Sequence, residues 1–181
     1  MKKAVFILIL LTTGLSVKSQ KNFNGFSLNP EIGLDIFSED LVPVYPAAKV
    51  NYYHNNFIFS AFYTYEGVFF PSTQNYDYNY FDLLFGEYID KNMFRFKFQT
   101  GAGIIFGNKR GKLKEVHKGM LSNTYIYETK TYVNFDMPLH LGISFIPCKY
   151  CAVGTDINFN LNSEKMLAGI AISLELGLIK E

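Results

Sequence analysis

The sequence contains no Trp, only two Cys, and few charged residues for its length. Charged residues make up 18% of the 181 residues, below the roughly 25% typical of soluble domains. The 17 Lys and Arg residues nearly balance the 16 Asp and Glu residues. The chain therefore lacks the basic excess of nucleic-acid-binding proteins, and we expect no nucleic-acid partner. No segment reaches 18 consecutive apolar residues, which excludes a helical membrane protein.

Apolar and aromatic residues are abundant instead. Hydrophobic residues account for 49% of the chain, and 18 Phe and 13 Tyr residues bring the aromatic share to 17%. Such a composition is unlike that of disordered chains. The length fits one ordinary domain with a sizeable core.

The first nineteen residues have the features of a secretory signal peptide. Lys2 and Lys3 precede the apolar run 4–11, which is much shorter than a membrane-spanning helix. Small residues follow, and cleavage after Ser19 fits the pattern. We therefore predict a signal peptide over residues 1–19 and a mature domain over residues 20–181. For that domain, a secreted soluble fold and a membrane β-barrel both remain open.

The mature chain alternates between apolar and polar or small residues, which is the period of a β-strand. Eight segments show this alternation, and several are about as long as tilted membrane strands, which need roughly 9–11 residues. The predicted strands cover residues 26–36, 47–54, 57–67, 78–89, 94–106, 134–145, 153–161 and 168–178.

The chemistry of the two strand faces separates soluble from membrane barrels. In residues 94–106, Phe94, Phe96 and Phe98 alternate with Arg95 and Lys97. Across the strands one face is almost purely Phe, Leu, Ile and Val, while the other holds many Gly, Ser and Asn residues. Apolar-out and polar-in alternation is typical of outer-membrane barrels. We predict an all-β, eight-stranded, antiparallel up-and-down transmembrane β-barrel. The opposite assignment gives a soluble lipocalin-like barrel that binds an apolar ligand.

The connections alternate between short and long. We expect short turns at residues 54–56, 90–92 and 147–151, and long connections at 38–46, 68–77 and 107–123. Outer-membrane barrels have short periplasmic turns and longer extracellular loops. The last long connection forms a predicted basic extracellular loop, which could meet lipopolysaccharide or an acidic extracellular partner. Its basic residues are Lys109, Arg110, Lys112, Lys114 and Lys118.

The mature region resembles the small eight-stranded outer-membrane barrels of the OmpA/OmpX-like superfamily, in the form common in Bacteroidota. The resemblance rests on the Lys-Lys signal peptide, the segments 30–33 and 135–139, and the closing strand 169–177. It implies location in the outer membrane of a Gram-negative bacterium, in contact with outer-membrane lipid. Such barrels often end on an aromatic residue, whereas this chain ends Leu-Ile-Lys-Glu.

The polar face of the strands carries charges of both signs. An eight-stranded barrel has just enough interior for its side chains, so these charges should pair with one another and plug the lumen. A narrow ion path is the functional alternative. The predicted lumen network comprises Glu31, Asp35, Lys49, Glu66, Asp82, Arg95, Lys97, Asp136, His140, Asp156 and Glu175.

Two further groups suggest chemistry. Cys148 and Cys151 flank a predicted turn, where a small disulfide is favoured over free thiols, redox function or metal binding. Asp136, His140 and Ser144 share one strand face, but four residues of strand span about 13 Å, too far for a hydrogen-bonded triad. We therefore expect no enzyme activity, cofactor or metal. For a membrane lipid-modifying enzyme, the sequence offers only His140 and scattered Ser residues.

Overall fold

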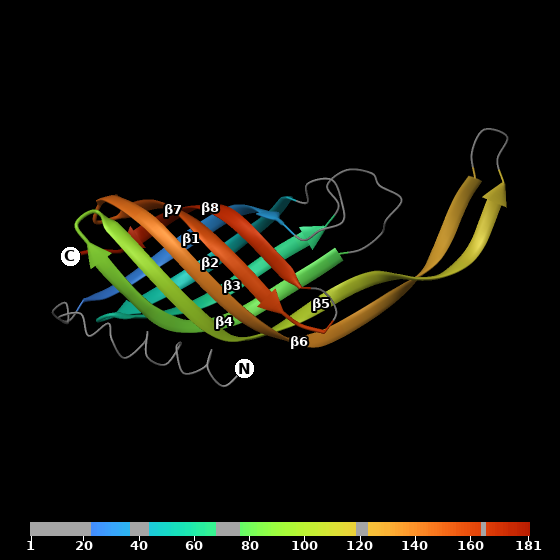
Figure 1. Cartoon of the computed structure of the whole chain (residues 1–181), viewed down its shortest axis with the longest axis horizontal. Helices are drawn as coiled ribbons and strands as arrows, with labels where there is room; N and C mark the ends of the chain where they lie inside the picture. Colours follow the sequence, from blue (N-terminus) through green and yellow to red (C-terminus); the bar gives the residue numbers. More distant parts are fainter. Residues whose placement is uncertain (1–22, 37–43, 68–76, 119–122, 164–165) are drawn as a thin grey trace, which may run out of the picture.

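The chain forms a closed barrel of eight antiparallel strands, described here from a computed structural model (Figure 1). The structure describes residues 23–36, 44–67, 77–118, 123–163 and 166–181. The predicted signal peptide and most of the first two predicted long connections lie outside these residues. No helix among the described residues is long and apolar enough to cross a membrane. The strands are β1 (Asn24–Asp35), β2 (Val44–His54), β3 (Phe57–Gly67), β4 (Asp77–Lys91), β5 (Phe94–Lys118), β6 (Asn123–Cys148), β7 (Cys151–Leu161) and β8 (Leu167–Leu178).

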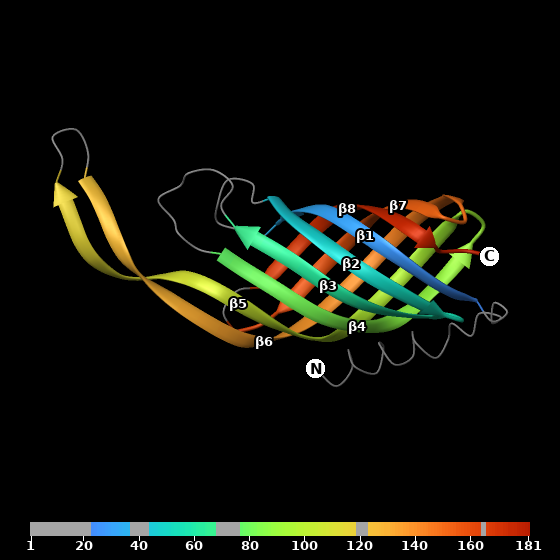
Figure 2. The ribbon, with the colours of Figure 1, turned by 180° about the vertical axis from the view of Figure 1, so that it is seen from behind.

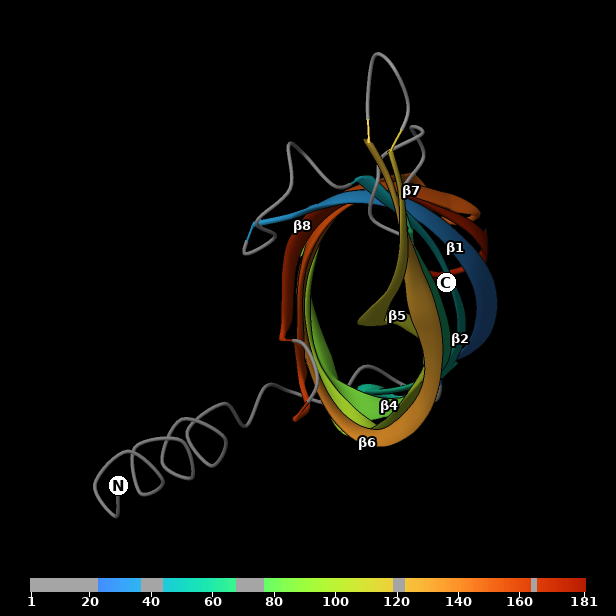
Figure 3. The ribbon, with the colours of Figure 1, turned by 90° about the vertical axis from the view of Figure 1, so that its right-hand side faces the viewer.

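Each strand pairs with the next one along the chain, and β1 pairs with β8 to close the ring. The closing register runs from Phe26 opposite Leu178 to Asp35 opposite Gly169. Figure 3 looks along the barrel and shows the strands arranged in a closed ring. The predicted eight-stranded, up-and-down antiparallel barrel is confirmed.

The two ends of the barrel differ. Three tight turns lie at one end, which we call the turn end, together with the C-terminus (Figures 1 and 2). Asn55 and Asn92 begin two of these turns with positive φ angles of 55° and 60°. Asn tolerates this left-handed conformation better than most residues. At the opposite end, which we call the hairpin end, β5 and β6 project far beyond the other strands.

The strand alternation separates an apolar outside from a polar inside. Along β1, every second residue is buried and its neighbours are exposed. Large apolar side chains dominate the exposed set; Ile172 and Val133 are each 70% exposed. The buried set includes Ser27, Asn51 and the eleven residues of the predicted lumen network. The barrel is therefore inverted relative to a soluble protein, which buries apolar residues and exposes charges.

Several strand boundaries differ from those predicted, most of all those of β2, β5 and β6. β2 begins at Val44, so Tyr45 lies in a strand rather than in a long connection. The predicted basic loop over residues 107–123 is wrong, because β5 continues to Lys118 and β6 begins at Asn123. Cross-strand pairing continues from Lys109 opposite Lys130 to Lys118 opposite Asn123, with two register shifts between them. Residues 124–133 are rich in Thr, Tyr, Ile and Val, which favour strands.

Candidate functional site

The structure places all eleven residues of the predicted lumen network inside the barrel. Each has a buried side chain, and they come from all eight strands. Alternation accounts for this placement, since each lies on the inward face of its strand. Three sets of contacts follow one another along the lumen. They are a central ionic network, the Arg95 guanidinium with its partners at the turn end, and an acidic group toward the hairpin end.

The central network joins two lysines to three carboxylates. Lys49 lies 2.9 Å from Glu31 and 3.8 Å from Asp156, measured from Nζ to a carboxylate oxygen. Lys97 lies 3.7 Å from Asp156 and 3.5 Å from Glu175. Asp156 therefore lies between the two ammonium groups. Charges buried away from bulk water require such partners, because desolvation of an unpaired charge is costly.

Neutral side chains also donate hydrogen bonds to the Glu175 carboxylate. Its Oε1 accepts hydrogen bonds from Ser27 Oγ at 2.5 Å, from Asn51 Nδ2 at 3.2 Å and from the Tyr53 hydroxyl. The Ser60 hydroxyl donates to Asn51 Oδ1 at 2.6 Å. Ser27 lies on β1, which pairs with β8, whereas Asn51 and Tyr53 lie on β2 and Ser60 lies on β3. The small polar residues of the inward face thus act as hydrogen-bond donors and fill the interior.

Arg95 closes the turn end of the lumen. Its guanidinium donates two hydrogen bonds to the Asp90 carboxylate, at 2.6 and 2.7 Å, and one to the carbonyl of Ile179 at 2.7 Å. The same guanidinium lies over the rings of Tyr53 and Tyr88, 4.6 and 4.1 Å from their centroids. Sequence analysis missed Asp90 because it was assigned to a turn. It is the direct partner of Arg95 across the β4–β5 hairpin.

The acidic group lies toward the hairpin end. Asn160 Nδ2 donates to Asp82 at 2.9 Å and also to Asp136, so one amide bridges two carboxylates. Asn162 donates to the other oxygen of Asp136 at 3.3 Å, and Asp35 accepts the backbone N–H of Ala168 at 3.4 Å. Within the described ranges, no group of three His, Cys, Asp or Glu side chains is placed to hold a metal ion.

The hydrolase-like trio does not form a relay. Asp136, His140 and Ser144 all point inward from β6. Neither ring nitrogen of His140 nor the Ser144 hydroxyl has a hydrogen-bond partner among the described residues. Instead, the His140 ring packs edge-on against Phe62, with ring centroids 4.6 Å apart. A nucleophile activated by histidine requires a hydrogen bond between the two side chains, and this arrangement lacks one.

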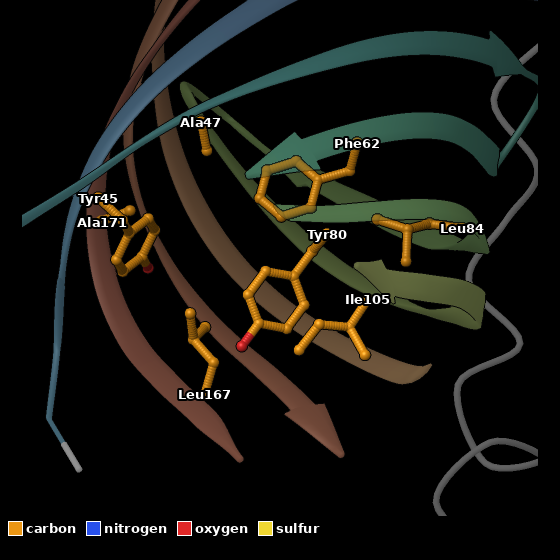
Figure 4. Close-up of a cluster of buried hydrophobic side chains, with 8 residues drawn as sticks. All are labelled: Tyr45, Ala47, Phe62, Tyr80, Leu84, Ile105, Leu167 and Ala171. Carbon is orange, nitrogen blue, oxygen red and sulfur yellow. The ribbon is translucent and has the colours of Figure 1, made fainter. Parts of the chain in front are cut away.

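Apolar clusters lie on both sides of the ionic centre. Figure 4 shows the cluster toward the hairpin end, where Tyr45, Phe62 and Tyr80 point into the lumen near Leu167 and Ile105. The cluster at the turn end comprises Phe23, Tyr53, Ile58, Tyr88, Ile146, Ala152 and Ile179. Large rings and paired charges thus occupy successive levels of the barrel.

This filling predicts that the barrel conducts poorly. Purified protein in a planar bilayer should show no stable steps on the nanosiemens scale, because rings and paired charges occupy the space that an eight-stranded barrel provides. Replacing Phe62 and Tyr80 by Ala together tests whether these side chains obstruct ion passage. Stable large steps from the unmodified protein would contradict a filled lumen and favour a pore.

The basic residues that were predicted to form a loop lie on the part of β5 that projects beyond the barrel. Residues 107–133 carry six Lys and Arg residues against two Glu residues, a formal charge of +4. Lys112 and Lys114 are exposed, and Lys109 lies over the Tyr132 ring at 5.6 Å. In the described residues, the outer edge of β5 pairs with β4 only as far as Asn108. The hairpin therefore presents a basic two-stranded ribbon beyond the barrel.

Comparison with solved structures identifies the class of barrel. The chain is similar to the N-terminal β-barrel domain of Pseudomonas aeruginosa OprF, with a TM-score of 0.56 at 8% identity, covering 87% of this chain and 99% of that one. It is similar to Yersinia pestis Ail, the attachment invasion locus protein (TM-score 0.57, 11% identity, 87% and 99% covered). It also resembles Neisserial surface protein A (TM-score 0.56, 8% identity, 91% and 100% covered).

These similarities define the fold as that of small eight-stranded outer-membrane barrels. No protein-family model matches the sequence, and no curated protein matches it.

Proposed function

We propose that the protein is a non-enzymatic integral outer-membrane barrel with a filled lumen, and that its projecting hairpin is the working surface. The inversion of the barrel carries this proposal: large apolar side chains cover the outside, and paired charges fill the inside. Hydrocarbon requires an apolar exterior and a closed sheet without open edges. A lipocalin-like protein needs an apolar interior for its ligand, and the ionic centre of this lumen disfavours that alternative.

The outer surface at the turn end supports a membrane position. Outward-facing polar residues at the turn end include Asn24, His54 and Glu87, all exposed. Aromatic rings gather beside them on the outside: Phe85 lies 5.5 Å from Phe57 and 5.0 Å from Phe59 between ring centroids. Aromatic girdles at membrane interfaces are typical of outer-membrane barrels. With short turns on the periplasmic side, the hairpin end would face the outside of a Gram-negative cell. That the protein is of the Bacteroidota type remains a prediction from the sequence.

The membrane assignment predicts resistance to extraction. When cells producing the full chain are fractionated and washed with alkaline carbonate, we expect the protein in the outer-membrane pellet. Detergent should then release it, because the apolar band must remain covered. Quantitative release by carbonate alone would favour the soluble alternative.

The partner of the hairpin is proposed from its charge. A ribbon with an excess of four positive charges suits a polyanionic glycan such as lipopolysaccharide, since clustered cations attract anions over several ångströms. Ail provides a supporting comparison, because a structure of that protein contains the heparin analogue sucrose octasulfate (TM-score 0.51, 11% identity, 85% and 95% covered).

Charge reversal on the hairpin tests this partner. The double variant Lys112→Glu/Lys114→Glu should bind heparin or lipopolysaccharide at least about tenfold more weakly than the unmodified protein, with a smaller dependence on salt. The matched control is Lys91→Glu/Lys149→Glu, which reverses two exposed lysines at the turn end. Equal losses in both variants would indicate attraction by net charge and not by the hairpin.

A further inference from the structure

The turn between β6 and β7 brings two cysteines together at the turn end. Cys148 and Cys151 are direct partners across this turn, and their sulfur atoms lie 2.7 Å apart as free thiols. Cys148 is exposed and Cys151 is half-buried. Both sulfurs are thus within reach of each other, and Cys148 is accessible to a reagent in solution.

The same turn binds the end of the chain. The two residues between the cysteines, Lys149 and Tyr150, offer their carbonyl oxygens to the C-terminal residues. The Lys149 carbonyl accepts N–H groups from Ile179 at 3.0 Å and Lys180 at 3.4 Å, and the Tyr150 carbonyl accepts that of Gly177 at 3.0 Å. Three backbone hydrogen bonds therefore join the C-terminus to the cysteine turn.

The bound C-terminus in turn packs into the turn end of the lumen. The Ile179 side chain is fully buried in the apolar cluster at the turn end. Its carbonyl accepts the hydrogen bond from Arg95, and Lys180 Nζ donates to the carbonyl of Asn92 at 2.7 Å. We call residues 177–180 the C-terminal clasp, because they link the cysteine turn, the β4–β5 turn and the lumen. Figure 1 shows the C-terminus at this end of the barrel.

We propose that Cys148 and Cys151 form a thiol–disulfide exchange site whose oxidation fixes the turn that holds the C-terminal clasp. The co-reactant is a disulfide-bearing oxidant, of the kind that oxidising compartments supply. The site would face the periplasm if the proposed membrane orientation holds. The chemistry itself depends only on the turn and the clasp.

Cys148 is the first nucleophile in this exchange. The hydrogen bond with the Cys151 thiol lowers the pKa of Cys148, and the thiolate is the reactive form. Cys148 loses its proton and attacks one sulfur of the oxidant, forming a mixed disulfide and releasing the first thiolate. Cys151 then loses its proton and attacks the Cys148 sulfur, releasing the second thiolate. The two cysteines are oxidised by two electrons, and the oxidant is reduced to two thiols.

Oxidation would act on the clasp by restricting the turn. The new bond closes a small ring through the backbone of Lys149 and Tyr150, the two residues whose carbonyls hold the C-terminus. Closing a ring reduces the number of conformations that the open turn can reach. The acceptors then stay aligned with the N–H groups of Gly177 and Ile179, and local opening of the clasp becomes rarer.

Hydrogen exchange on the full chain in detergent micelles tests this proposal. The protein is treated with dithiothreitol or with oxidised glutathione, and the mass of peptide 147–151 reports whether the internal disulfide forms. Amide exchange at residues 177–180 is then compared between the two forms. We expect the oxidised form to exchange about tenfold more slowly there, with no change in the β2–β3 turn.

A variant without the two thiols provides the control. Cys148→Ser/Cys151→Ser treated in the same way should show no response, and the comparison within the unmodified protein stands even if this variant folds poorly. Failure of the internal disulfide to form, or equal exchange of the clasp in both redox forms, would overturn the proposal. Because the measurement uses micelles and no binding partner, its result is independent of the proposed membrane location and of the hairpin's ligand.

Discussion

Replacing Lys97 by Met is expected to destabilise the barrel by about 3–5 kcal/mol, the cost typical of removing one partner from a buried ion pair. Lys97 contacts two carboxylates, Asp156 and Glu175, and its own side chain is 2% exposed. Met fills a similar volume, so the loss should come from the carboxylate left without its cation and not from a cavity. The free energy of unfolding is measured in urea, by circular dichroism or gel mobility, since the chain has no Trp.

The matched control also removes the charge of the Glu175 carboxylate. Lys97→Met/Glu175→Gln should recover much of the lost stability, because Asp156 still has Lys49 at 3.8 Å and accepts a hydrogen bond from Ser173 at 2.6 Å. Coupling between the two sites should exceed about 1 kcal/mol. If the double variant were no more stable than the single one, the central ionic network would not be what Lys97 stabilises.

The barrel and its faces could be predicted from the sequence because both depend on a period of two. Alternation places Lys49, Arg95 and Glu175 on one side of their strands whatever the neighbouring strand is. It also places the Phe and Ile residues on the other side. The number of strands follows from counting the alternating segments, and closure follows because a membrane does not tolerate open sheet edges.

Alternation alone does not predict which side chains contact one another inside the lumen. The ion pair between Lys97 and Glu175 joins β5 to β8 across the barrel, so it depends on the stagger of all the strands between them. The exception is Asp90 and Arg95, which face each other across a single hairpin. That pair could be predicted from the sequence if the predicted strand 78–89 is extended to Lys91, where β4 ends.

The hairpin was missed for a different reason. Residues 107–118 contain Gly, Lys and Asn, which weaken the strand pattern, and their pairing partner 123–133 has strong strand propensity. The pairing also carries two register shifts, which interrupt the alternation that predicted the other strands. A weakly patterned segment becomes a strand here because the adjoining strand offers it a backbone to pair with.

Tyr45 is expected to be one of the largest single contributors to stability, through contacts with two glycines that lie far from it along the chain or on another strand. Its side chain is fully buried and points into the lumen from β2 (Figure 4). A Cβ added at Gly33 on β1 or at Gly169 on β8 would overlap the Tyr45 ring or its hydroxyl. The ring therefore lies across β1 and onto β8, over the seam where the barrel closes.

Two substitutions and their combination test this packing. Tyr45→Ala should cost about 3–5 kcal/mol, as expected for loss of a large buried ring. Gly169→Ala should cost about 1–3 kcal/mol, because the added methyl forces the ring into the apolar cluster behind it. In the Tyr45→Ala background the same methyl enters vacated space, so Gly169→Ala should be nearly neutral, and the two changes should be coupled by at least about 1 kcal/mol. Strict additivity in urea unfolding would show that Gly169 is needed for its backbone and not for the tyrosine that lies over it.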